Sequence, residues 1–357
     1  MKILLPLLFL ALSPLAAQEA EHEFPPPAPN EPWLHGKTGL RFPHELAGMT
    51  CENGFDYGDV PSGESLRYVN RDLRIRADVY VFPCPHPLDT PAAVKEATRI
   101  EAQNVLAGLE EMAKRGLYSH IRQNTATYKE VDLYPESAGK SGWLEFTVNA
   151  VIHEKSPAGD SEQDILSYGG IGVFRDHFVK VRCTVPAENN KEVEKQISDF
   201  VGAVRFCTFM EPGLRAEMRR HIRAYRVDPF SDAARDAVGA MVFYAEETPT
   251  LFFSVSGKVA TLGGSLKPSV ADADKEFMGA FFIGAVDAGV REPPPKTVDL
   301  EQGGAEEMVR LYERLKKNSP KLQSNEMDVF VKATKAGKGG EWLRDNPPAP
   351  SKSKEPR

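Results

Sequence analysis

Two short motifs in this chain of 357 residues contain residue types used in serine chemistry. Ser137 and Lys140 have S-x-x-K spacing, and Lys37, Thr38 and Gly39 read K-T-G, two motifs that a class of acyl-transfer enzymes combines. In that class the serine opens a helix and the K-T-G follows on a strand. Here the K-T-G comes first and Ser137 precedes a strand-like segment, so the sequence predicts no catalytic serine.

Histidine and cysteine spacing predicts no metal site and no cofactor. His153 and Glu154 begin an H-E-x-x-H pattern, but Pro157 stands where the second histidine belongs. Cys84 and His86 are close, but prolines on both sides favour a rigid turn, and zinc needs three or four ligands.

Four cysteines, Cys51, Cys84, Cys183 and Cys207, leave two interpretations open. In an oxidising compartment they could form two disulfides, with three possible connectivities, of which Cys51 with Cys84 and Cys183 with Cys207 is preferred. Alternatively all four are buried thiols, because a chain of this length does not need covalent links to stabilise its core.

Two glycine-containing segments resemble nucleotide-binding loops only superficially. Gly169, Gly170 and Gly172 lie inside a strand-like segment, which favours a bulge or close packing over a dinucleotide loop. Residues 256–258 read S-G-K but lack the upstream glycine of a phosphate loop.

Arginines concentrate at helical spacing in residues 214–226, where Arg215, Arg219 and Arg223 define a candidate face for an anionic lipid or an acidic partner. The alternative is a solvated helix face, which is the usual role of such a charge run.

The ends of the chain indicate an exported protein. Lys2 leads into an apolar run that Ala16 and Ala17 close, so residues 1–17 are predicted to be a signal peptide, too short to span a membrane. No cysteine follows the cleavage site, so we expect a periplasmic or extracellular protein that is not a lipoprotein. Residues 18–36, acidic and proline-rich, and residues 346–357 are predicted to be disordered.

Composition excludes two partner classes. A formal charge of -7 argues against nucleic acid, and 27% charged with 41% hydrophobic residues is typical of a globular chain without a transmembrane segment. The length allows two domains, which we place at residues 37–209 and 210–345.

The first domain reads as strands, helix, strands, helix. Thr90 and Pro91 can start a helix that ends near Gly116, and a second apolar stripe covers residues 193–204. Strands are expected at residues 65–70, 74–83, 143–152, 165–174 and 178–185, with a polar loop over residues 153–164. This order predicts an α+β fold with an antiparallel sheet covered by helices.

Three segments, VYVF before the first helix, GLYSHI after it and FVKVRCTVP before the second, resemble the Mog1/PsbP-like α/β/α sandwich over roughly residues 42–206. The resemblance implies a binding or assembly role and transfers no site residue. The whole chain also resembles a family of exported bacterial proteins, which implies an architecture and no activity.

Helical periodicity dominates after Met210, which predicts a small all-helical domain. Residues 251–256 are a strand or a buried linker. Residues 276–290 are too short for a membrane span, and Ala280, Gly284 and Ala288 would let another helix approach closely.

These patterns favour a non-catalytic binding or assembly module with a protein partner in the cell envelope. A small-ligand carrier and an unrecognised hydrolase remain as alternatives. A module needs an exposed patch, a carrier needs an apolar pocket, and a hydrolase needs a nucleophile and a base in contact within a cleft.

Overall fold

The computed structural model describes residues 22–29, 31–58, 63–124, 126–135, 140–156, 159–188, 191–291 and 299–345. The predicted signal peptide, the tail from residue 346, Ser137 and Pro157 lie outside these residues. The chain forms two compact units, which divide between Gly213 and Leu214.

The first unit is built on a large antiparallel sheet, so the predicted α+β fold is confirmed. In the described part of the chain this sheet has ten strands in the order β1-β5-β6-β7-β12-β11-β10-β8, with β4 beside β5 and β9 beside β10, and β2 and β3 form a separate pair. The strands are β1 His22–Phe24, β2 Trp33–Leu34, β3 Arg41–Phe42, β4 Glu45–Leu46, β5 Met49–Asp56, β6 Glu64–Asn70, β7 Ile75–Pro83, β8 Tyr118–Gln123, β9 Thr127–Asp132, β10 Lys140–Ser156, β11 Gly159–Phe174 and β12 His177–Pro186.

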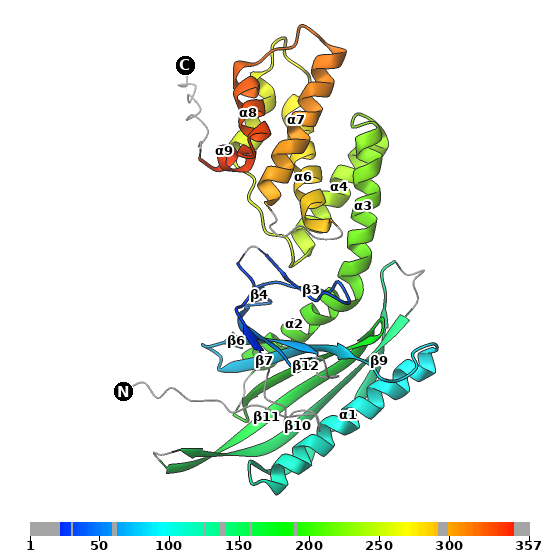
Figure 1. Cartoon of the computed structure of the whole chain (residues 1–357), viewed down its shortest axis with the longest axis vertical. Helices are drawn as coiled ribbons and strands as arrows, with labels where there is room; N and C mark the ends of the chain where they lie inside the picture. Colours follow the sequence, from blue (N-terminus) through cyan, green and yellow to red (C-terminus); the bar gives the residue numbers. More distant parts are fainter. Residues whose placement is uncertain are drawn as a thin grey trace. The chain divides into compact units, whose positions relative to one another are not determined.

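Helix α1 (Pro91–Lys114) covers one face of the sheet, as Figure 1 shows. Its start is the predicted one, because the Thr90 side chain accepts a hydrogen bond from the backbone N–H of Ala93. Lys180 on β12 donates to the Glu101 carboxylate of α1 at 3.0 Å, and both side chains are less than 10% exposed. This buried ion pair ties α1 to the sheet.

Helix α2 (Lys191–Arg205) packs on the opposite face through the predicted apolar stripe, in which Val193, Ile197, Phe200 and Val204 are buried. The helix continues through a π-helical segment, Phe206–Met210, directly into α3 (Glu211–Val227). The helical region after residue 210 is therefore not separated by a break from the helix before it.

Strands form at the three segments predicted for β10, β11 and β12, and the predicted alternation in β10 is confirmed, with Leu144, Phe146 and Val148 buried beneath α1. The expected polar loop over residues 153–164 is wrong, because β10 continues to Ser156 and β11 begins at Gly159. Backbone pairing carries the two strands past the end of the apolar pattern.

The glycines of β11 allow close packing rather than forming a bulge. Gly172 lies opposite Trp143 on β10, and a Cβ on Gly172 would approach the indole ring to 2.6 Å. A Cβ on Gly170 would be 2.8 Å from Val181 and clash with the same ring. Glycine is therefore what leaves space for a fully buried Trp143.

The predicted disordered arm differs from the structure where residues 22–34 are described. Strand β1 pairs with β5, the Phe24 and Trp33 rings stack with centroids 6.4 Å apart, and Asn53 donates to Glu23 at 2.7 Å. Aromatic residues among the prolines give this segment a surface to bury, which a composition argument overlooks.

All four cysteines lie in the described residues, and none forms a disulfide. The preferred pair of Cys51 with Cys84 fails geometrically, since Cys51 belongs to the core under α2 whereas Cys84 packs against the core under α1, on the other face. Cys183 and Cys207 share the core under α2 but are free thiols. Cys183 and Cys207 are completely buried. Burial raises the pKa of Cys51 to about 12, so this thiol stays protonated at neutral pH.

The second unit is helical. Its helices are α4 Asp232–Glu247, α5 Gly257–Thr261, a 3-10 turn Leu262–Ser265, α6 Ala273–Val290, α7 Leu300–Asn318, α8 Asn325–Lys335 and α9 Gly339–Asp345. Residues 251–256 form neither helix nor strand, so the expected strand is wrong, and the segment is a linker in which only Leu251 is buried. Among the described helices, none is both long and apolar enough to cross a membrane.

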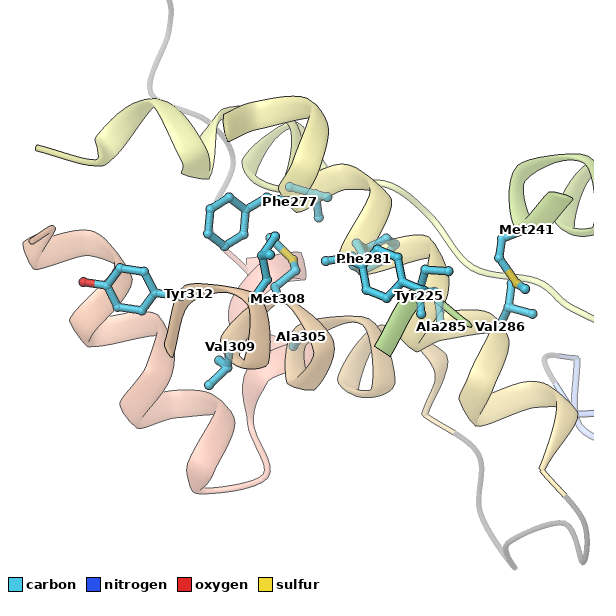
Figure 2. Close-up of a cluster of buried hydrophobic side chains, with 14 of the residues drawn as sticks. Tyr225, Met241, Phe277, Phe281, Ala285, Val286, Ala305, Met308, Val309 and Tyr312 are labelled. Atoms are coloured by element: carbon cyan, nitrogen blue, oxygen red, sulfur yellow. The ribbon is translucent and has the colours of Figure 1, made fainter. Parts of the chain in front are cut away.

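Helix α6 forms the centre of this unit and packs closely on α7, where Phe281 and Met308 lie in one apolar cluster (Figure 2). The expected small-residue contact is confirmed. A Cβ on Gly284 would clash with the Gly303 carbonyl of α7, and a Cβ on Gly303 would be 2.7 Å from Ala288.

Candidate functional site

A groove of about 580 Å³ lies in the first unit, beside strand β9. One side is formed by β9 and the residues that follow it, and the other by the end of α2 and the π-helical segment. The lining residues are Lys129, Glu130, Val131, Asp132, Leu133, Tyr134, Gly202, Arg205, Phe206 and Met210.

The floor of the groove is apolar. Val131 and Leu133 are half-buried and pack against the core under α2, and Phe206 and Met210 are half-buried on the helical side. A cluster of exposed apolar surface in a concave site is typical of a place where another molecule binds.

The π-helical segment shapes this floor. In its wider turn the backbone N–H of Glu211 donates to the Phe206 carbonyl, five residues earlier. The Thr208 hydroxyl donates to the Val204 carbonyl at 2.7 Å. Cys207, Thr208 and Phe209 are buried, while the residues at each end of the segment line the groove. Single π turns inside α-helices frequently occur at functional sites.

A carboxylate fixes the basic side of the groove. Glu145 on β10 accepts hydrogen bonds from Lys129 at 2.5 Å, from Trp143 Nε1 at 3.0 Å and from Arg205 at 3.3 Å. These contacts join β9, β10 and α2 around one anion. Because Lys129 and Arg205 are restrained, less side-chain entropy is lost when they contact a ligand.

Strand β9 leaves one edge open. It pairs with β10 from Thr127 opposite Glu145 to Asp132 opposite Lys140, and within the described residues no strand pairs with its other side. An edge of this kind presents unpaired backbone N–H and C=O groups, which can accept another strand.

The structure does not assemble the serine motifs. Lys140 forms ion pairs with Glu130 at 3.3 Å and Asp132 at 3.9 Å, and Ser137 lies outside the described residues. The K-T-G forms a turn between β2 and β3, where the Thr38 hydroxyl lies 2.8 Å from His35 Nδ1.

The candidate arginine face is not one exposed face. Arg215 is 2% exposed, and Arg219 is half-buried and donates to the Val290 carbonyl at 3.1 Å. Only Arg223 of the three is exposed. Helical spacing alone did not show that two of these side chains turn toward the protein.

No cluster that could hold a metal ion occurs among the described residues. The Cys84 thiol donates to the His86 carbonyl at 3.9 Å, a backbone contact that fits the predicted turn.

A serine, a histidine and a carboxylate do meet across three strands. Ser119 Oγ lies 2.7 Å from His153 Nε2, and His153 Nδ1 lies 3.2 Å from Glu162. In serine hydrolases the orienting carboxylate is buried, whereas the Glu162 side chain is 73% exposed. Water therefore competes for this carboxylate, and we interpret the trio as cross-strand hydrogen bonding.

Sequence reasoning missed the groove, although a signal existed. Residues 129–133 alternate, with Val131 and Leu133 on one face and Glu130 and Asp132 on the other, which is a strand pattern.

No protein family model and no curated protein matches this chain. Several solved structures are similar to part of it, and two of them each have 13% identity over 49% of this chain. One is cyanobacterial PsbP from Synechocystis, with 92% of its chain covered and a TM-score of 0.30, and the other is the Saccharomyces cerevisiae Ran-binding protein Mog1p, with 93% covered and a TM-score of 0.23. These are the two proteins named by the resemblance in the sequence, and the likeness is too low for their names to say what this chain binds.

Proposed function

We propose that this chain is an exported, non-catalytic binding module whose groove takes an extended segment of a partner protein. The segment adds to the open edge of β9 and places apolar side chains on the floor formed by Val131, Leu133, Phe206 and Met210. The observation that carries the proposal is the position of this apolar floor directly beside an open strand edge.

Strand addition explains both parts of the site. Backbone hydrogen bonds to β9 would supply affinity for any extended chain, and the floor would select segments with an apolar residue at every second position. The charged lining residues, Lys129 and Arg205 with Glu130 and Asp132, carry both signs, so the apolar positions rather than charge select the segment.

The small-ligand carrier remains the alternative occupant of the same groove. Its volume lies within the range of small-molecule sites, roughly 300–1,000 Å³. Such sites enclose most of the ligand, whereas Lys129, Glu130 and Asp132 are exposed along this border. We therefore favour a chain that extends beyond the groove over a ligand enclosed in it.

Replacing Gly202 by leucine is expected to weaken partner binding at least tenfold, about 1.4 kcal/mol. Gly202 lies on the α2 side of the groove, and a Cβ there meets no atom within 4 Å, so the new side chain enters the groove without disturbing the helix. Gly239 on α4 is also open and serves as the control, since its replacement by leucine leaves binding unchanged.

The partner is found by photo-crosslinking the mature chain in its native envelope from position 130, with position 110 on the exposed side of α1 as the control. The proposal requires one captured segment with alternating apolar residues whose synthetic peptide binds and loses affinity in Gly202→Leu. Equal capture at both positions, or a peptide indifferent to Gly202→Leu, contradicts it. A bound small molecule displaced by Gly202→Leu would establish the carrier.

Export is part of the proposal and rests on the leader sequence. We expect the mature protein to begin at Gln18, after cleavage behind Ala17. N-terminal sequencing of protein recovered from the envelope or the medium tests this, and an intact Met1 in that fraction would argue against a cleaved signal peptide.

A further inference from the structure

We propose that the second unit binds the phosphate group of a small organic molecule in a cavity at the end of helix α3. The cavity is about 330 Å³ and lies entirely within this unit. Its lining residues are Tyr225, Arg226, Pro229, Glu307, Arg310, Leu311 and Arg314. This site is separate from the groove at β9 and does not depend on its function.

Glu307 holds two of the guanidinium groups in place. Its side chain is 4% exposed, and its Oε2 accepts from Arg226 Nε at 3.0 Å, from Arg226 Nη2 at 2.7 Å and from Arg310 Nη1 at 2.6 Å. Arg226 also contacts Asp287 at 3.0 Å, and Arg291 contacts the same carboxylate. Arg226 and Arg310 are therefore oriented before any ligand arrives, which reduces the side-chain entropy lost on binding.

Arg314 is fixed differently. It donates to the carbonyl oxygens of Arg226 at 3.3 Å and Val227 at 2.8 Å, the last residues of α3. Three guanidinium groups and one carboxylate therefore line the cavity, which gives it an excess of positive charge. Asp287 and Arg291 lie at its border, and because their opposite charges cancel, they leave this excess unchanged. A cavity with this charge favours an anion although the chain as a whole is acidic.

Tyr225 supplies a further donor. The residue is 3% exposed, and its hydroxyl has no hydrogen-bond partner among the described residues. Burial, together with the charge of Glu307, raises the pKa of this phenol, so it keeps its proton at neutral pH. A buried hydroxyl without a partner is costly, and an oxyanion in the cavity is an acceptor that would satisfy it after a small movement.

The arrangement of donors favours phosphate over a single carboxylate. The guanidinium groups come from α3 and from two successive turns of α7, so they approach from different directions. A tetrahedral phosphate has three terminal oxygens to receive them, and guanidinium groups bind phosphate oxygens in pairs of hydrogen bonds. The volume exceeds that of the phosphate group, which leaves room for part of an organic molecule.

The test measures binding of inorganic phosphate and pyrophosphate to the full mature chain by calorimetry, at constant ionic strength with chloride as the competing salt. We expect Arg314→Gln to raise the phosphate Kd about tenfold or more, and Tyr225→Phe to raise it several-fold. Arg220→Gln on the exposed side of α3, where Arg220 forms an ion pair with Glu217 at 3.8 Å and does not line the cavity, is the matched control and leaves Kd unchanged.

If circular dichroism shows that Arg314→Gln does not fold, Arg310→Gln replaces it as the cavity variant, because the Arg310 side chain is exposed and its loss disturbs the core less. Phosphate binding that is equal in the control and in the folded cavity variants overturns the proposal. So does a wild-type chain whose melting temperature responds to phosphate no more than to chloride. Malonate binding as tightly as pyrophosphate would overturn the preference for phosphate.

Discussion

Replacing Trp143 by alanine is expected to lower the free energy of unfolding of the first unit by about 3–5 kcal/mol. Trp143 is fully buried, fits over two glycines of β11 and meets the Phe209 ring edge-on with centroids 6.0 Å apart. Alanine would leave a large cavity in a region where both neighbouring glycines lack side chains to fill it. Urea denaturation monitored by amide exchange in β10 and β11 measures the loss.

Phe243 provides the comparison for this prediction. It lies on α4 of the second unit and is 62% exposed, so Phe243→Ala should change the free energy of unfolding of that unit by about 0.5 kcal/mol or less. A loss as small as this for Trp143→Ala in the first unit would mean that the packing around Trp143 does not stabilise the sheet. The Trp143 variant should also weaken partner binding, because Glu145 loses one of the donors that position it beside the groove.

Two glycines of the second unit should respond to alanine with opposite signs. Gly284→Ala is expected to destabilise the unit by about 1–3 kcal/mol, since its Cβ would meet the backbone of Gly303 and the Cβ of Glu307, and backbone cannot move aside cheaply. Gly239→Ala is expected to stabilise it by about 0.5–1 kcal/mol, because α4 gains a better helix former with open space around it.

Thermal unfolding of the two alanine variants, measured side by side, provides the check. A Gly284→Ala variant as stable as the wild type would contradict the close approach of α6 and α7 at Gly284, and a loss of stability in Gly239→Ala would contradict the open space around α4. Altered phosphate binding in Gly284→Ala is also expected, because Glu307 holds the cavity arginines from the same contact.

The fold was predictable where one physical signal was strong. Thr90 and Pro91 marked a helix start because capping is local, and the alternation from Leu144 to Ile152 marked a strand because one side is buried. The pairing that extends β10 to Ser156 was not predictable, since backbone hydrogen bonds there join polar residues. The strand at His22–Phe24 was missed for a similar reason, as its partner lies far along the chain in β5.

The candidate sites depend on tertiary contacts that sequence does not encode locally. Val131 and Phe206 line one groove although three strands and a helix separate them in the chain. Arg226 and Glu307 are also far apart in the sequence, and nothing in either segment marks the other as its partner. The predicted arginine face at residues 214–226 includes side chains that the protein covers. Periodicity gives the spacing of side chains around a helix, but it does not show which side of the helix is buried.

The charged residues of β9 have a consequence for self-association. An exposed strand edge is a template for the same edge of another copy, and natural sheets counter this with charged side chains. Lys129, Glu130 and Asp132 occupy half of this six-residue strand. An edge-to-edge dimer would take water from these three charged side chains, so the strand remains available to a partner without drawing the chains into aggregates.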